Sequence, residues 1–579
     1  MGGGACDGMK VWRIQSLPPP IMEDDEESKE AVGMDRIRTP KALAEPGQVR
    51  MEPEISPFEL KNQLIQLAQE HQRKSARVML DAGRGNPNWV AAAPREAFFA
   101  LGQFAMTECR RVCDEGDLAG KPRRDGMGAR FEAFAAAHRD TPGVALLQRI
   151  VQWGVDRCGF SAEEWLYELV DGIVGDNYPT PDRMLTRVER VMHQYLIREL
   201  CQGDESCGPF DLFATEGGTA AMCYLFDTLL ANRLLRRGDR VAVGVPIFPP
   251  YVEIPQLHRY DFDVVEVRAT GRDEAGRHTW QYPPEEVEKL ADPSVKAFFL
   301  VNPSNPPSVA MAPETVRRVV ELVREHHPNL MIITDDVYAT FVDGFRSLLA
   351  ELPHNTAAVY SLSKYFGVTG WRLGVIAVHR DNVFDRLLRA HPEEVRRELA
   401  ARYAFVTPRV EELRFVDRLV ADSRQVALNH TAGLSTPQQV QMALMAVFAL
   451  LDADDTYKRQ TQAICRRRMR LLYEGLGMPE PRLPLDADYY TEFDLEEWSN
   501  LHYGRAFTEY LTSRHSPLEV LYRLAERSAI VLLPGGGFHG PRWSVRVSLA
   551  NLDDDAYRTI GRVLHEVLEE FVAEWRGAP

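Results

Sequence analysis

The middle of the chain alternates short apolar runs with longer stretches of helical periodicity. The runs are rich in Val, Ile, Leu and Phe, and they lie at 240–245, 263–267, 296–301, 330–335, 356–363 and 373–378. Between them, apolar residues recur every three or four positions, as on one face of a helix. Strands that alternate with helices indicate βαβ units, so we predict an α/β fold whose mainly parallel sheet is covered on both faces.

Helical periodicity dominates the flanks of this region. Residues 57–80, most of 94–172 and residues 183–201 repeat apolar side chains at helical spacing. The chain becomes helical again from Thr436 and then ends in mixed helix and strand that includes WSVRVSLA. Residues 1–50 carry an acidic, proline-containing sequence that cannot bury a core, and we predict a disordered or extended arm there.

Composition excludes several classes of protein. A chain of 579 residues favours two or three domains, and its net charge of −16 opposes binding to nucleic acid or anionic lipid. We find no apolar run of membrane-spanning length and no secretory leader, so we expect neither a membrane nor a nucleic-acid partner. The eight cysteines complete no zinc pattern, which favours reduced thiols, a cytoplasmic location and no metal.

A lysine follows the fifth apolar run, in YSLSKYFGVTGWRLG at 360–374. Taken alone, Lys364 fits a solvated surface lysine. Its neighbours change the interpretation, because the Ser361 hydroxyl and the Arg372 guanidinium can hold a phosphate dianion. Lys364 would then reach an aldehyde of the same molecule, and a lysine amine with a lowered pKa forms imines with carbonyl compounds.

Two other loops after predicted strands carry polar side chains of matching chemistry. Asp335 ends IITD and can pair with a protonated ring nitrogen, although strand-terminal aspartates often only cap a turn. Tyr338 and Asn305, in DDVYATF and FLVNPSNPP, can donate to a phenolic oxygen on the same ring. Asn-Pro sequences are otherwise ordinary turn formers.

The first two loops of the sheet offer an anion site and an aromatic surface. Gly217, Gly218 and Thr219, in TEGGTAAM, precede a helical run and resemble an anion-binding helix N-terminus. Phe248, in VPIFPPY, can stack on a flat ring, although core packing explains it equally well on its own. Loops at the carboxyl ends of parallel strands line one crevice, so we expect all these residues to meet there.

In this order and spacing, the five segments resemble the class I and II aminotransferases of fold type I. The resemblance implies a seven-stranded, mainly parallel sheet in a large domain, pyridoxal 5′-phosphate as cofactor, and Lys364 as the residue that binds it covalently. It further implies that Asp335 pairs with the pyridine nitrogen and that Tyr338 and Asn305 contact the phenolic oxygen, while Phe248 stacks on the ring. The implied phosphate ligands are Gly217, Gly218, Thr219, Ser361, Ser363 and Arg372.

The same resemblance extends to the substrate and to a second subunit. Arg546, in SVRVSLAN, matches the arginine that binds the substrate's α-carboxylate. Tyr178, in GDNYPTPDRM, resembles a tyrosine that reaches the phosphate of a neighbouring subunit, which implies a homodimer with shared sites. We expect a small domain built from both chain ends, with boundaries at 1–50 (arm), 51–182 (N-terminal part of the small domain with a helical insertion), 183–435 (large cofactor-binding domain) and 436–579 (C-terminal small domain).

The extra length and the motifs GRGNPNW, TEGGTAAM and LPGGGFHGPRW are similar to the aspartate 4-decarboxylase family. That family converts L-aspartate to L-alanine and carbon dioxide, has a side activity as an aspartate aminotransferase with a 2-oxo acid, and assembles dimers into dodecamers. Aspartate carries two carboxylates, so a second cation is needed, and Arg84 in GRGNPNW is our candidate for the side-chain carboxylate. His539, near Arg546, is a weaker candidate for a proton carrier.

Two alternatives stay open at this point. One is a plain aminotransferase that acts on aspartate or another amino acid, in which the insertions serve only assembly. The other is a regulator that uses an aminotransferase-like domain to bind the cofactor. The acidic N-terminus and the absence of a recognisable DNA-binding helix-turn-helix argue against the regulator.

Overall fold

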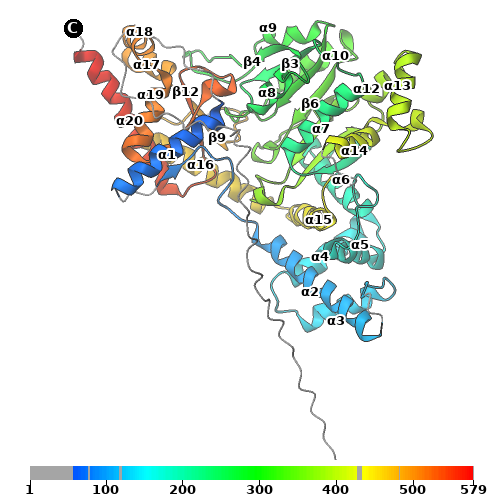
Figure 1. Cartoon of the computed structure of the whole chain (residues 1–579). Coiled ribbons are helices and arrows are strands. Elements are labelled where there is room, and N and C mark those ends of the chain that lie inside the picture. Colours follow the sequence, from blue (N-terminus) through cyan, green and yellow to red (C-terminus); the bar gives the residue numbers. More distant parts are fainter. Residues whose placement is uncertain (1–55, 76–78, 117–119, 427–432, 482, 578–579) are drawn as a thin grey trace, which may run out of the picture. The chain divides into compact units, whose positions relative to one another are not determined.

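The computed structural model describes residues 56–75, 79–116, 120–426, 433–481 and 483–577. The predicted arm at 1–50 lies outside them. The described residues belong to one compact unit, Glu52–Pro579. Within it, a central sheet, a helical region beside it and a smaller α/β region can be followed by colour in Figure 1.

The central sheet has seven strands, as predicted. Its order is β2 (Phe210–Thr215), β8 (Gly374–His379), β7 (Thr356–Ser361), β6 (Met331–Asp335), β5 (Val295–Val301), β3 (Arg240–Val245) and β4 (Asp263–Arg268). Only β8 runs antiparallel to its neighbours β2 and β7, so the sheet is mainly parallel. All six apolar runs form strands of this sheet, whereas β2 was not among the predicted runs.

Both faces of the sheet are buried, which explains why its strands read as continuous apolar runs. Successive side chains of a strand point to opposite faces of the sheet. Val243 and Phe299 accordingly belong to one hydrophobic cluster, and Ala242 and Phe298 belong to another. The first face packs against α6 (Thr186–Cys201) and α7 (Gly218–Ala231), with α14 (Phe415–Val426) packed on α7. The second face is covered by α10 (Pro313–Glu325) with the short helix α9 (Pro284–Val287).

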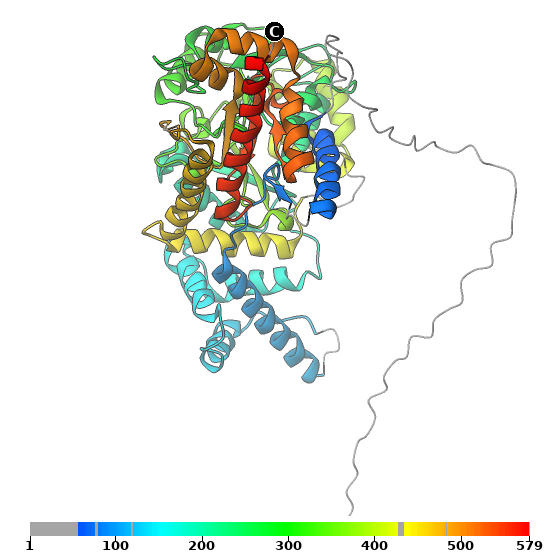
Figure 2. The same ribbon diagram turned by 90° about the vertical axis from the view of Figure 1, so that its left-hand side faces the viewer.

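A second hydrophobic core joins the two ends of the described chain. It unites α1 (Pro57–Ser75) and β1 (Leu80–Asp81) with residues between Met469 and Val572. β1 pairs in parallel with β10 (Ile530–Val531), and β12 (Ser544–Ser548) lies between β11 (Leu533–Pro534) and β9 (Tyr490–Asp494). Figure 2 shows the orange α19 (Pro517–Ser528) between the blue α1 and the red α20 (Asp554–Gly577). This packing agrees with a small domain built from both chain ends.

The predicted helical insertion forms a bundle that packs on the large core. Its helices are α2 (Ala92–Asp114), α3 (Met127–Ala137), α4 (Val144–Cys158) and α5 (Ala162–Val174). They share the first hydrophobic cluster with α15 (Thr436–Leu451), which contacts α2, α4, α5 and α6. Because α15 packs on this side, residues from 436 onward contribute to both cores, and the domain boundaries at 182 and 435 stay a prediction.

Further helices complete these cores or connect them. The helices are α8 (Pro250–Gln256), α11 (Leu348–Glu351), α12 (Val383–Arg389), α13 (Glu393–Tyr403), α16 (Thr456–Leu476), α17 (Leu495–Tyr503) and α18 (Arg505–Arg514). Short 3-10 turns lie at Glu205–Cys207, Glu288–Ala291, Ala339–Phe341, Thr369–Trp371, Val410–Glu412 and Gly535–Phe538. Among the residues described, no helix combines the length and the apolar character needed to cross a bilayer.

Candidate active site

The lysine loop meets the GRGNPNW turn from the far end of the sequence. Lys364 follows β7, is half-buried, and its Nζ donates a hydrogen bond of 2.9 Å to the Gly85 carbonyl. Tyr489, at the start of the segment leading into β9, donates its hydroxyl to the same oxygen at 2.8 Å. A Cβ atom at Gly85 would lie 3.1 Å from Lys364 Nζ and 2.5 Å from the Tyr490 hydroxyl, so this close approach requires glycine.

Asp335 is a fully buried carboxylate at the end of β6. The Tyr251 hydroxyl donates to its Oδ2 at 2.5 Å, and the backbone N–H of Val337 donates to Oδ1 at 3.2 Å. Burial raises the pKa of Asp335 to about 6, while the two hydrogen bonds and the charge of Lys364 act in the lowering direction. A protonated ring nitrogen against this carboxylate would supply the missing positive partner.

The N-terminus of α7 lies against the same carboxylate. Gly218 begins the helix, and a Cβ there would lie 3.7 Å from Asp335 Oδ2 and 3.9 Å from Ser361 Cβ. Gly217, with φ of +91°, faces Arg372, whose Nη2 would lie 2.4 Å from a Cβ at that position. Only glycine therefore lets the guanidinium lie across the start of the helix.

Hydroxyl groups complete an anion-binding surface at this helix start. Ser361 and Ser363 are buried, with their Oγ atoms 2.9 Å apart. Thr219 is exposed in the first turn of α7, and Arg372 is exposed and donates to the Thr369 carbonyl at 3.0 Å. Unpaired helix N–H groups, hydroxyls and a guanidinium are the ligands that bind phosphate in proteins.

Arg546 is a buried guanidinium whose described partners are uncharged. From β12 it donates through Nη2 to the Gly83 carbonyl at 2.6 Å and through Nη1 to Asn305 Oδ1 at 3.3 Å. Its face packs on the rings of Tyr490 and Phe538, with its central carbon 4.4 Å and 4.9 Å from the ring centroids. Its Nε is buried without a hydrogen-bond partner. A buried charge is costly unless it is paired, so this group is suited to bind a carboxylate.

Tyrosine hydroxyls line the space between Arg546 and the lysine loop. Tyr338 is buried, and its hydroxyl lies 3.0 Å from that of Tyr490. Tyr489, Tyr490 and Tyr251 were not among the predicted site residues. The first two lie about 110 residues beyond the end of β8, so only the pairing of the two domains reveals them. Tyr251 stands three residues after Phe248 and offered a local signal.

Three further predicted site residues lie beside these groups or on the protein surface. The side chain of Arg84 is 58% exposed and donates through Nε to Asp81 Oδ2 at 3.1 Å, so no described contact turns it toward Lys364 or Arg546. Phe248 packs edge-on against Tyr251 with ring centroids 5.6 Å apart. Tyr178 is exposed beside a small pocket lined by Asn177, Gly433 and Pro437.

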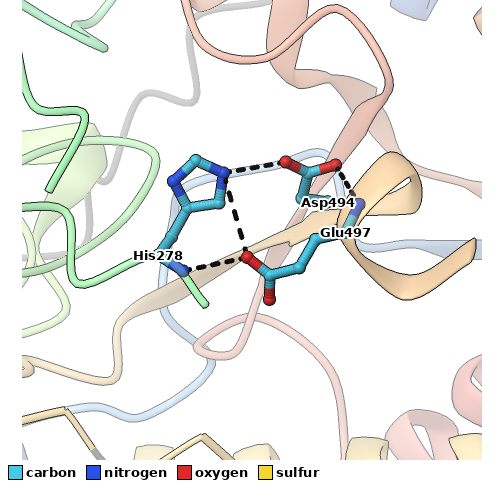
Figure 3. Close-up of side chains that lie close together, drawn as sticks. All are labelled: His278, Asp494 and Glu497. Carbon is cyan, nitrogen blue, oxygen red and sulfur yellow. Dashed lines mark hydrogen bonds and ion pairs between the residues drawn. The ribbon is translucent and has the colours of Figure 1, made fainter. Parts of the chain in front are cut away.

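Two histidines make contacts between the two domains. His539 lies 2.7 Å through Nδ1 from Glu266 Oε1, so it is engaged by β4 and does not contact Arg546. Figure 3 shows a second junction, in which His278 Nε2 lies 2.8 Å from Asp494 Oδ2 and the His278 N–H donates to Glu497 at 2.9 Å. Arg272 lies 3.0 Å from the same His278 nitrogen and 3.3 Å from Glu497. Its guanidinium already supplies positive charge to this cluster, which we interpret as an ion-pair junction.

Comparison with known proteins agrees with this geometry. The family model described as aminotransferase class I and II matches residues 215–564, more than half of the chain. A Pseudomonas protein named bifunctional aspartate aminotransferase and L-aspartate beta-decarboxylase is 49% identical over 524 residues, 90% of this chain and 97% of that protein.

Solved structures share the fold. The aspartate aminotransferase of Rhizobium meliloti matches with a TM-score of 0.55 and 16% identity over 89% of this chain and 96% of its own. A single mutant of the Thermus thermophilus aspartate aminotransferase matches with a TM-score of 0.54 and 18% identity, over 89% and 97% of the two chains. The chain therefore belongs to the class I and II aminotransferase family, whose enzymes work with pyridoxal 5′-phosphate.

Proposed function

We propose that this enzyme removes the side-chain carboxylate of L-aspartate, giving L-alanine and carbon dioxide, and transaminates aspartate as a second activity. The observation that carries the proposal is Arg546, a buried guanidinium with uncharged partners at the meeting point of both domains. The Pseudomonas relative, similar over almost its whole length, supports the choice of aspartate and of decarboxylation.

The residues present fit pyridoxal phosphate. The start of α7 with Gly217, Gly218 and Thr219 would hold the phosphate, together with Ser361, Ser363 and Arg372. Asp335 fits the ring nitrogen, because it is a buried carboxylate that still lacks a contacting cation among the described side chains. Asn305 and Tyr338 would contact the phenolic oxygen, and Phe248 would lie on the ring.

When bound, the cofactor supplies an aldehyde that joins the substrate amine and a ring that takes up electrons from bonds broken next to it. Lys364 would first hold the cofactor and then carry the proton of the substrate's α-carbon. Asp335 would keep the ring nitrogen protonated and so favour that electron flow. Arg546 would orient the substrate by its α-carboxylate, which leaves the side chain to face the GRGNPNW turn.

Decarboxylation places a second demand on the site. The side-chain carboxylate must be bound firmly enough to select aspartate and weakly enough to leave as carbon dioxide. Arg84 suits this demand, because it already shares its charge with Asp81 and is more than half exposed. It would have to turn from Asp81 toward the substrate, and its flanking residues Gly83 and Gly85 both lie in the site.

A plain aspartate aminotransferase is the second candidate, favoured by the folds of the Rhizobium and Thermus enzymes. Incubation of the cofactor-loaded protein with L-aspartate and no 2-oxo acid separates the two. Sustained release of equal alanine and carbon dioxide over many turnovers supports the decarboxylase. At most one turnover, restored by 2-oxoglutarate, would mean an aminotransferase alone. Lys364→Ala is the control, and it should lose both the cofactor's bound absorbance and all turnover.

We further propose a cytoplasmic homodimer in which Tyr178 reaches the partner's phosphate site, and dimers that assemble into a dodecamer. The exposed tyrosine ring and the thiol state of every described cysteine support this view. Light scattering of the purified enzyme measures the assembly. Mixed dimers of Tyr178→Phe and Lys364→Ala chains test the shared site, since only one of the two sites in such a dimer would carry both changes.

A further inference from the structure

A buried glutamate stands directly opposite Arg546 in the small domain. Glu492 of β9 and Arg546 of β12 are partners in the antiparallel register, and both side chains are more than nine-tenths buried. Cross-strand partners lie on the same face of a sheet. Nevertheless, no ion pair joins these two described residues, and Glu492 Oε2 and Arg546 Nε are each buried without a hydrogen-bond partner.

The hydrogen bonds around Glu492 are compatible with a neutral carboxyl group. The Ser544 hydroxyl lies 2.8 Å from Glu492 Oε1 and 2.7 Å from the Pro541 carbonyl oxygen. A hydroxyl has a single hydrogen, and the Pro541 carbonyl can only accept one. If Ser544 donates to Pro541, the contact with Glu492 must be donated by Glu492 itself, which requires a protonated carboxyl. An ionised Glu492 would take the Ser544 hydrogen and leave the carbonyl without it.

The surroundings of Glu492 favour the same state. Burial raises the pKa of Glu492 to about 8, and the neighbouring charge of Asp494 also raises it, whereas Ser544 and Arg546 act in the lowering direction. Two basic residues of the loop over Glu492 have other partners. His539 lies within hydrogen-bond distance of Glu266, and the charge of Arg542 acts to lower the pKa of Glu496.

Two glycines of the GGGFHG loop close directly over this carboxyl group. A Cβ at Gly535 would lie 2.3 Å from Glu492 Oε1, and one at Gly540 would lie 2.4 Å from the same oxygen. The loop can therefore pack this closely against Glu492 only with glycine at both positions. The same loop carries Phe538, which packs on the Arg546 guanidinium. The backbone of the loop that forms one wall of the arginine site therefore packs directly on Glu492.

We propose that Glu492 is a positioning residue that stays neutral beside Arg546, so that the guanidinium is held by uncharged contacts and keeps its charge for a carboxylate ligand. This inference rests on the proposed role of Arg546 as the site of the substrate's α-carboxylate. An ionised Glu492 would itself supply the missing counter-charge, and it would then compete with the ligand.

Binding of succinate to the cofactor-loaded enzyme tests the inference without turnover, because succinate has two carboxylates and no amine. Calorimetry across pH 6 to 9 would compare the wild type with Glu492→Gln, which keeps the shape and hydrogen bonding of the neutral acid. We expect equal affinity at pH 6 to 7 and an advantage for the variant that reaches about tenfold at pH 9. Glu496→Gln is the control, because Glu496 lies just beyond the end of β9. Its affinity for succinate should show the same pH dependence as that of the wild type.

Infrared spectra give a second readout that does not depend on binding. Burial also raises the pKa values of Asp336 and Asp486, so the readout is the difference between the two spectra. At neutral pH, the spectrum of the wild type minus that of Glu492→Gln should contain the carbonyl band of one protonated buried carboxyl. Equal affinities of wild type and Glu492→Gln at pH 9, or absence of that band, would overturn the inference. Succinate binding that survives Arg546→Leu unchanged would instead refute the role proposed for Arg546, so the two failures are distinguishable.

Discussion

Replacing Gly85 by alanine tests the meeting of the lysine loop with the GRGNPNW turn. The added Cβ would lie 2.5 Å from the Tyr490 hydroxyl, whereas ordinary contact begins at 3.4 Å. The hydroxyl must then retreat by the difference, which breaks its 3.0 Å contact with Tyr338. Overpacking costs about 1–3 kcal/mol and a lost hydrogen bond about 1 kcal/mol. If this cost falls on the productive geometry, kcat/KM for aspartate drops between about 30-fold and 900-fold.

Gly83→Ala provides a matched control two residues away. A Cβ there meets Asp81 Oδ1 at 3.1 Å, Leu533 Cγ at 3.3 Å and Lys61 Cδ at 3.4 Å, so small shifts accommodate it. Its carbonyl, which accepts from Arg546, is retained. The assay is steady-state kinetics with aspartate, together with the absorbance of bound cofactor and thermal unfolding. If Gly85→Ala keeps kcat/KM within a few-fold of Gly83→Ala, the close approach is not needed for function and the reasoning is refuted.

Three further changes address single groups. In urea titrations, the stability advantage of Glu492→Gln over the wild type should grow by about 2 kcal/mol from pH 6 to pH 8. The folded-state pKa of Glu492 is raised to about 8, so the wild type loses stability as the pH rises above about 4.5. A pH-independent difference would contradict this. Tyr251→Phe removes a donor to Asp335, so the pKa of that carboxyl in the cofactor-free protein should rise further above about 6. Infrared or NMR titration of Asp335 measures this pKa, and an unchanged value would exclude Tyr251 from this role. Arg84→Ala should weaken aspartate at least tenfold more than alanine in binding titrations, and equal losses would remove it as the side-chain ligand.

The parts of the site that follow single strands were predictable from the sequence. Asp335, Asn305 and Lys364 each stand where an apolar run ends, and parallel strands bring such ends to one edge. The apolar runs also predicted the sheet itself, because strands that are buried on both faces are apolar along most of their length. β2 was missed because its FDLFAT sequence interrupts the apolar run with a buried aspartate, Asp211, which pairs with arginines from other segments.

Contacts between the domains were beyond the reach of local patterns. Tyr490 and Glu492 alternate with Thr491 on an ordinary short strand, and nothing in that strand shows which face meets Arg546 or Gly85. Arg84 illustrates the converse, since a turn arginine can be chosen as the ligand of a second carboxylate on charge alone, while its side chain pairs with Asp81. Side-chain direction depends on the tertiary partner, which the sequence pattern does not contain.

The parallel pairing of β1 with β10 has a consequence for biosynthesis. β1 leads directly into Gly83 and Gly85, yet its partner strand at Ile530–Val531 is made only when nearly the whole chain has left the ribosome. Domains generally fold as units during synthesis. The central sheet can therefore form before the residues that pack against α1 and β1 have been made. The growing chain therefore carries the lysine loop and the GRGNPNW turn before the pairing of β1 with β10 can bring them together. Binding of substrate has to wait until β10 has been made and has paired with β1.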